Sequence, residues 1–129
     1  MPLQYYDLPE GSLEDRHYRV FPEDIESDPL IVFHATPAAN LDSIVENGLL
    51  PGNMAGANLE TISYGEDSMA AMIRWQNHPL KAQEWVVLAL KFSNRDELYD
   101  ANGTTHSNAL RVQPEIAGVI VLPAGYRLQ

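Results

Sequence analysis

Residues 30–51, LIVFHATPAANLDSIVENGLLP, join a predicted buried strand to a predicted helix. The first four of these residues are apolar and include β-branched side chains, and the run ends at His34, which is typical of a buried strand. Thr36 is expected to cap the N-terminus of the helix, with Pro37 at its first position. The helix is expected to present one apolar face, formed by Leu41, Ile44 and Val45.

The rest of the chain predicts further short strands and a second helix. Residues 85–92 are the strongest strand candidate, and weaker candidates are 61–64, 110–112 and 118–122. A second helix is expected over about 67–76, with an apolar face formed by Met69, Met72 and Ile73. Turn-forming residues predict polar loops at 51–60 and 100–108. Together these elements predict an α+β domain with one or two small sheets flanked by two helices.

Residues 1–29 predict an acidic N-terminal arm that precedes a domain formed by residues 30–129. Residues 1–30 contain eight Asp or Glu and two Arg, so they hold six of the ten excess negative charges of the chain. Prolines interrupt the arm, and only residues 17–21 are expected to form a short strand. We expect either a solvated acidic face or a partner-binding arm. Its candidate anchors are Tyr5, Tyr6, Leu8, Tyr18, Val20 and Phe21.

The composition excludes several kinds of chemistry. The chain has no Cys, which removes disulfides, thiolate nucleophiles and zinc–thiolate sites. Its net charge of −10 opposes non-specific binding to nucleic acid, because neutralising phosphates requires clustered cations. No apolar run approaches the roughly 18 residues of a membrane helix, and the first ten residues lack the basic region of a secretory signal. We therefore expect a cytoplasmic protein without a membrane partner, and the His spacing predicts no metal site.

His34 is the main candidate for chemistry. It follows an apolar strand and precedes a helix whose N-terminal amides attract an anion or a carboxamide. The structural alternative is a partly buried histidine that bonds to the backbone, with Thr36 acting only as a helix cap.

Residues 32–51 resemble the opening segment of ADP-ribosyltransferase-like domains. In that superfamily a strand ends in His-Gly-Thr or His-Ala-Thr, and a helix containing Leu-x-x-Ile leads to Gly-Leu and a proline. Weaker resemblance in order and spacing extends the match to about residues 30–123. The resemblance implies a split β-sandwich of two small sheets with flanking helices. It also implies that NAD binds in a cleft between the two sheets.

The resemblance implies a role for each residue of the His-Ala-Thr segment. His34 is expected to hydrogen-bond a ribose hydroxyl of NAD, while the backbone of Ala35 holds the nicotinamide carboxamide. Thr36 is expected to orient His34 or the ribose. Fixing the carboxamide and the ribose would let the glycosidic bond lengthen toward an oxocarbenium-like state, from which nicotinamide leaves.

Two further positions of the superfamily have more than one candidate in this chain. The next strand is expected to contribute Ser63 and an aromatic side chain that stacks on nicotinamide. One register puts Thr61 at the aromatic position, and a shifted register puts Tyr64 there. The third position is a Glu, Gln or Asp that bonds a ribose hydroxyl and steers the acceptor, for which Gln113 and Glu115 are candidates. If residues 114–116 instead match a structural turn of the superfamily, this position falls within residues 105–108, none of which is acidic.

These features predict an NAD-binding mono-ADP-ribosyltransferase that uses NAD as substrate, needs no metal and modifies a protein or nucleotide acceptor. One alternative is a catalytically inactive module of the same fold that recognises a partner or acts as an inhibitor, since the stacking aromatic and the acid are not clearly matched. Another is an acidic binding protein that uses its N-terminal arm. The RNA 2′-phosphotransferases of the superfamily have the most similar opening segment, but they need several arginines to hold the RNA phosphate, and this chain has few.

Overall fold

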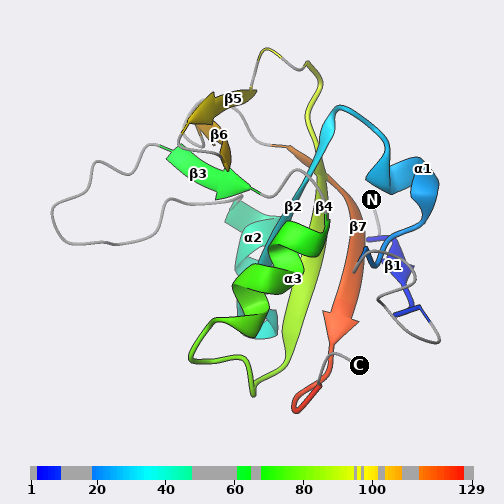
Figure 1. The fold of residues 1–129 in the computed structure, drawn as a ribbon, viewed down its shortest axis with the longest axis vertical. Helices are drawn as coiled ribbons and strands as arrows, with labels where there is room; N and C mark the ends of the chain where they lie inside the picture. The colour runs from blue at the N-terminus through cyan, green and yellow to red at the C-terminus, as the bar shows by residue number, and fades with distance from the viewer. Residues whose placement is uncertain are drawn as a thin grey trace, which may run out of the picture.

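The computed structural model describes residues 3–9, 19–47, 61–64, 68–94, 96, 98–101, 104–108 and 114–126. Within these residues the chain has a mixed α+β fold with one four-stranded and one three-stranded sheet, which confirms the predicted class (Figure 1). The elements in chain order are β1 (Tyr5–Tyr6), α1 (Glu23–Glu26), β2 (Ile31–Pro37), the 3-10 helix η2 (Ala38–Asn40), α2 (Leu41–Asn47), β3 (Thr61–Tyr64), α3 (Ser68–Gln76), β4 (Trp85–Lys91), β5 (Leu98–Ala101), β6 (Thr104–Asn108) and β7 (Glu115–Leu122).

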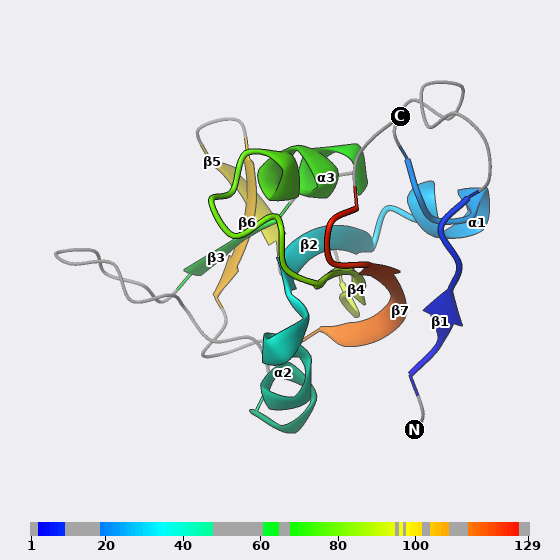
Figure 2. The same ribbon diagram turned by 90° about the horizontal axis from the view of Figure 1, so that it is seen from below.

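The four-stranded sheet has the order β1-β7-β4-β2. Strand β4 pairs antiparallel with both β2 and β7, and β1 lies parallel to β7. Residues 85–90 of β4 are all buried, because α3 covers one face of the sheet and α2 covers the other (Figure 2). A strand that is buried on both faces has no polar face, so its sequence is continuously apolar.

Two apolar cores lie on the two faces of this sheet. The first, which we call the α3-side core, contains Ala71, Met72 and Trp75 of α3 together with Phe33 and other inward residues of β2, β4 and β7. The second, the α2-side core, consists of Val32, Leu41, Val86, Leu88, Leu90, Phe92 and Val119. Successive residues of β2 therefore alternate between the two cores, as expected for a strand.

Helix α3 buries a different face from the one predicted. Its buried residues are Ser68, Ala71, Met72 and Trp75, whereas Ile73 is 52% exposed. Residues 73 and 75 are about 200° apart around a helix, so they cannot both face the sheet. Burying the larger Trp75 side chain removes more apolar surface from water, and Ile73 is turned outward.

The start of the first long helix also differs from the prediction. Strand β2 continues through Pro37, and the N–H of Ala38 donates to the carbonyl oxygen of Glu84 at 2.9 Å. Thr36 therefore lies in the strand and caps no helix, because pairing with β4 holds its backbone extended. In α2, Leu41 and Ile44 contact the α2-side core, whereas Val45 is 53% exposed and does not share their face.

Residues 98–101 and 104–108 form two paired strands, where a polar loop was predicted for 100–108. Strands β5 and β6 pair antiparallel, with Ala101 opposite Thr104. The two residues between these partners are Asn102 and Gly103, a dipeptide that strongly favours two-residue hairpins. The predicted strands at 61–64 and 118–122 are confirmed as β3 and as part of β7. The predictions for residues 51–60 and 110–112 lie outside the described residues.

Part of the segment 1–29 packs in the α3-side core. Val20, Phe21 and Ile25 are buried in the α3-side core, so Val20 and Phe21 are anchors as predicted, whereas Tyr5 is 53% exposed. The short helix α1 was not predicted, and the described residues 19–21 of the predicted strand form no strand. Strand β1 pairs parallel with β7, and the Tyr6 ring lies so close to Gly118 that a β-carbon at this position would be 2.8 Å from Cε2 of Tyr6.

Candidate functional site

His34 lies within β2 and not at its end, because the ladder with β4 continues to Pro37. Strand β2 is one of the two outer strands of the four-stranded sheet. The His34 side chain is half-buried and lies in register with Leu88 of β4 and Val119 of β7, both of which are fully buried in the α2-side core. Side chains that are directly opposite in antiparallel strands lie on the same face, so the imidazole stands on the α2 face, beside an apolar surface.

The backbone of Ala35 is directed to the outer edge of β2. The N–H of Phe92 donates to the carbonyl of Leu30 at 2.9 Å, and the Ala38–Glu84 bond marks the other end of the same ladder. Antiparallel ladders bond alternate residues, so the even-numbered residues of β2 bond to β4, and the N–H and C=O of Ala35 point away from it. The N–H of Ile31, which has the same parity, donates to the carbonyl of Asp28 at 3.1 Å and thus agrees with this direction.

The peptide groups of Ala35 are buried as well as outward-facing. Ala35 is 1% exposed. Among the described residues, its N–H and C=O, which point away from β4, form no hydrogen bond. Buried backbone groups are nearly always paired. Among the described residues, the N–H and C=O of Ala35 thus lie side by side at the edge of β2 as one donor and one acceptor, a pattern that complements a primary carboxamide.

Thr36 follows on the same face of β2 as His34, because side chains two residues apart in a strand share a face. It is 7% exposed. The Asn40 side chain, from η2, donates from Nδ2 to the Thr36 hydroxyl oxygen at 3.0 Å. Asn40 was not among the predicted site residues, and the signal that would have identified it is its four-residue spacing from Thr36.

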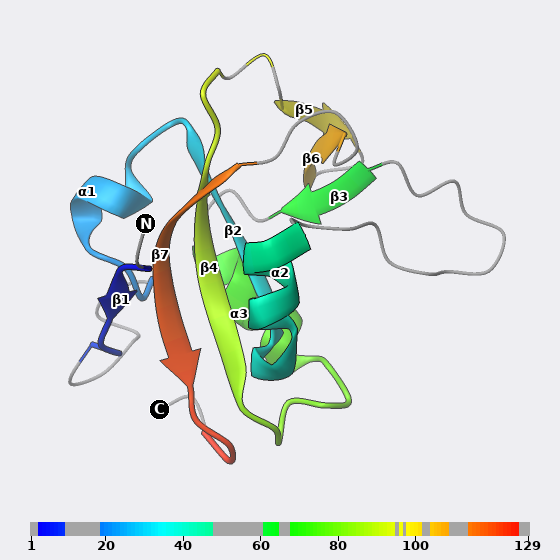
Figure 3. The same cartoon turned by 180° about the vertical axis from the view of Figure 1, so that it is seen from behind.

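Ser63 and Tyr64 lie in β3, which belongs to the three-stranded sheet with the order β3-β6-β5. Strand β3 contacts β2, so the two sheets meet at these two strands (Figure 3). His34 lies in β2 and Ser63 lies in β3. Ser63 is the cross-strand partner of His106, and Tyr64 is the partner of Thr105. Residues 105–108, the alternative third position, thus lie in the same sheet as Ser63.

Glu115 is not brought near His34. It is the first residue of β7, is exposed, and lies in register with Lys91 of β4, which in turn lies opposite Ile31. Ile31 packs in the α3-side core, so this row of residues lies on the α3 face, opposite to the face of His34. The rows that contain Ile31 and His34 are also three residues apart along β2, which is about 10 Å. The other candidate, Gln113, lies outside the described residues.

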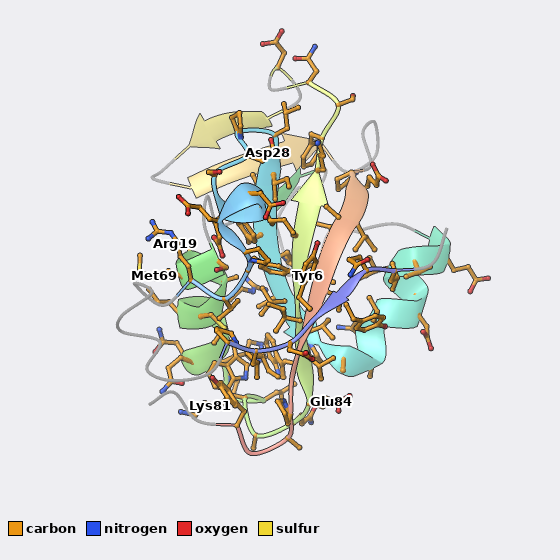
Figure 4. The ribbon with its side chains drawn as sticks, turned by 90° about the vertical axis from the view of Figure 1, so that its right-hand side faces the viewer. Tyr6, Arg19, Asp28, Met69, Lys81 and Glu84 are labelled. Carbon is orange, nitrogen blue, oxygen red and sulfur yellow. The ribbon has the colours of Figure 1, made fainter. Side chains whose placement is uncertain are left out.

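Among the described residues, Asp28 and Tyr126 have shifted pKa values, and neither lies next to His34 in the chain. The N–H of Leu30 is the main cause that lowers the pKa of the Asp28 carboxyl below its usual value; burial opposes this shift, and Lys91 adds to it. Burial raises the pKa of the Tyr126 phenol above its usual value. Figure 4 shows Asp28 and Glu84 near opposite ends of the sheet; the Asp28 carbonyl accepts from Ile31 at the start of β2, and the Glu84 carbonyl accepts from Ala38 just after its end. The described residues contain no cluster of side chains suited to hold a metal ion.

Comparison with protein-family models, with curated proteins and with solved structures found no match. No helix in the described ranges has the length and apolar character needed to cross a membrane.

Proposed function

We propose that this chain is an NAD-binding ADP-ribosyltransferase-like protein, with a split β-sandwich fold, that transfers ADP-ribose from NAD to a protein or nucleotide acceptor. The segment that resembles the superfamily includes β2, η2 and α2. The contact between β2 and β3 supports a ligand site that draws on both sheets.

The observation that carries the proposal is the outward N–H and C=O of Ala35. A nicotinamide carboxamide has one acceptor oxygen and one NH₂ group, so it can accept from this N–H and donate to this C=O at the same time. The two bonds would fix the plane of the nicotinamide ring relative to β2. His34 precedes Ala35 in the chain, and its half-buried imidazole suits a neighbouring ribose hydroxyl.

The chemistry would consist of positioning more than of covalent participation by the protein. With the carboxamide held at Ala35 and the ribose at His34, the bond between ribose C1 and the nicotinamide nitrogen can break. Its electron pair leaves with nicotinamide, which becomes neutral. A nucleophile of the acceptor then bonds to C1 and releases its proton to water. Holding the reactants in this geometry replaces a large entropic cost of the reaction.

The position of Glu115 favours the inactive module as a second candidate. Its carboxylate lies on the opposite face of the sheet from His34, so it cannot steer an acceptor at that site from its present position. A protein that binds NAD or ADP-ribose at Ala35 without transferring it would then recognise a partner or act as an inhibitor.

Two measurements test these proposals. Isothermal titration with NAD and with ADP-ribose should detect binding at or below millimolar ligand, and the absence of binding by both would overturn both candidates. An assay for nicotinamide release then separates transfer from silent binding. If Glu115→Gln abolishes nicotinamide release, transfer requires the Glu115 carboxylate. If the variant still releases nicotinamide, a different residue occupies the third position.

A matched control addresses the role of the imidazole. His34→Ala should abolish NAD binding, whereas His78→Ala should leave it intact. His78 is also half-buried and makes contacts of its own, since its Nδ1 accepts from the N–H of Leu80 at 3.1 Å and its ring packs on Trp85 with centroids 4.8 Å apart. Equal loss in both variants would mean that destabilisation, and not the site, explains the effect.

A further inference from the structure

We infer that Asn40 is a positioning residue that makes the Thr36 hydroxyl a hydrogen-bond donor toward the ligand beside His34. The inference rests on the proposed function for the identity of the ligand. It adds a requirement to that function, because the ligand group next to Thr36 must then carry an acceptor oxygen, such as a ribose hydroxyl oxygen.

In the hydrogen bond between Asn40 and Thr36, Asn40 is the donor. The side-chain nitrogen of Asn40 can only donate, so at 3.0 Å the oxygen of Thr36 is the acceptor. A hydroxyl has two lone pairs and one proton. Since Asn40 occupies one lone pair, the proton of Thr36 is left to point to another acceptor.

The Thr36 proton has no acceptor within the described ranges, where no hydrogen bond with Thr36 as donor joins it to another residue. Thr36 is 7% exposed, so little of this residue is in contact with solvent. A buried donor without an acceptor is costly, and a ligand oxygen would remove this cost.

The side chains of Thr36 and His34 are close enough to bind one sugar. Thr36 and His34 lie two residues apart on one face of β2, about 7 Å between Cα atoms. A ribose that bonds to the imidazole therefore lies within reach of the Thr36 hydroxyl. The two side chains would hold the sugar at two points, and Asn40 would set the polarity of the second point.

The substitution Asn40→Asp tests this polarity without changing the size of the side chain. A carboxylate accepts where the amide nitrogen donates, so the Thr36 proton would turn toward Asp at position 40 and the ligand would lose its donor. We expect NAD affinity measured by titration to fall about tenfold, the effect of roughly one hydrogen bond. A negative charge at the start of α2 favours the helix, so the variant should fold, which a thermal melt checks.

Two companion variants separate polarity from charge. Ala39→Asp adds the same charge at the exposed neighbouring position and should change NAD affinity by less than about twofold. In a Thr36→Val background, which lacks the hydroxyl, Asn40→Asp should cause no further loss. An Asn40→Asp variant with unchanged affinity, or one that weakens binding equally with and without the Thr36 hydroxyl, would overturn the inference.

A measurement without ligand keeps the inference distinct from the proposed function. In NMR spectra of the free protein, the side-chain amide protons of Asn40 should shift on Thr36→Val and stay unchanged on His78→Ala. An unchanged Asn40 signal in Thr36→Val would mean that the amide nitrogen does not donate to Thr36, and the inference would fail. If the wild type binds neither NAD nor ADP-ribose, the proposed function fails instead, and the ligand part of the inference fails with it.

Discussion

Replacing Glu26 by Ala should destabilise the protein, because this carboxylate joins α1 to the first turn of α3. It accepts from the backbone N–H groups of Phe21 at 3.0 Å and Ser68 at 3.2 Å. It also accepts from the Ser68 hydroxyl, whose oxygen in turn accepts from the N–H of Val20 at 2.9 Å. Ser68 is fully buried, so water cannot replace the lost acceptor there.

The magnitude follows from the three bonds that Glu26 accepts. A hydrogen bond contributes about 1 kcal/mol net, and bonds to charged groups contribute more. Because Glu26 is only half-buried, we use the lower value for each bond. The variant should thus lose about 3 kcal/mol of unfolding free energy, or roughly 10 °C in Tm for a chain of this size.

Urea denaturation followed by tryptophan fluorescence measures this loss, because Trp75 and Trp85 are each 1% exposed and report on the core. Asp24→Ala is the matched control, because Asp24 is exposed on the same helix and its substitution also removes one negative charge. We expect the control to change stability by less than about 0.5 kcal/mol. If Glu26→Ala costs no more than Asp24→Ala, the network does not stabilise the contact between α1 and α3.

Three further predictions concern packing and pH. Gly118→Ala should cost about 1–3 kcal/mol by denaturation, and Tyr6→Ala should relieve part of that cost, because the added β-carbon lies 2.8 Å from the Tyr6 ring. Trp85→Phe should cost about 1–3 kcal/mol more than Trp75→Phe, since the Trp85 indole donates to a carbonyl at 3.0 Å whereas that of Trp75 is buried without a partner in the described structure. Asp28 has a lowered pKa, so its ionised form stabilises the fold above the usual pKa of an Asp carboxyl, and this stabilisation is lost as pH falls through the lowered pKa of the folded state; Asp28→Asn should flatten the acid side of the stability profile.

The sequence predicted the elements that depend on local pattern. The apolar runs at 30–33 and 85–92 correspond to strands β2 and β4, and a helix was expected where α3 forms. The prediction for 100–108 was wrong, although the Asn-Gly pair at 102–103 contained the signal for the hairpin. The buried face of α3 was harder to predict, because Trp75 and Ile73 are both apolar but cannot both face the sheet. Packing in the folded protein determines that Trp75 is buried and Ile73 is exposed.

For the candidate site, the His-Ala-Thr segment could be selected from the sequence, but its surroundings could not. That Ala35 turns its peptide groups outward depends on β2 being an outer strand and on its register with β4. That Glu115 lies on the opposite face from His34 depends on the register of β7. Both facts arise from pairings between residues far apart in the chain, which no local pattern encodes.

The sequence by itself indicated that the segments of β2 and β4 are extended and that the segment of α3 is helical, and it selected His34 as a candidate for chemistry, because side-chain periodicity and residue chemistry act locally. The tertiary structure decided how the strands are ordered, toward which edge of the sheet the peptide groups of Ala35 point, and which side chains share a face. Those outcomes depend on burying two apolar cores at once, on the two faces of one sheet, and this is a property of the whole chain.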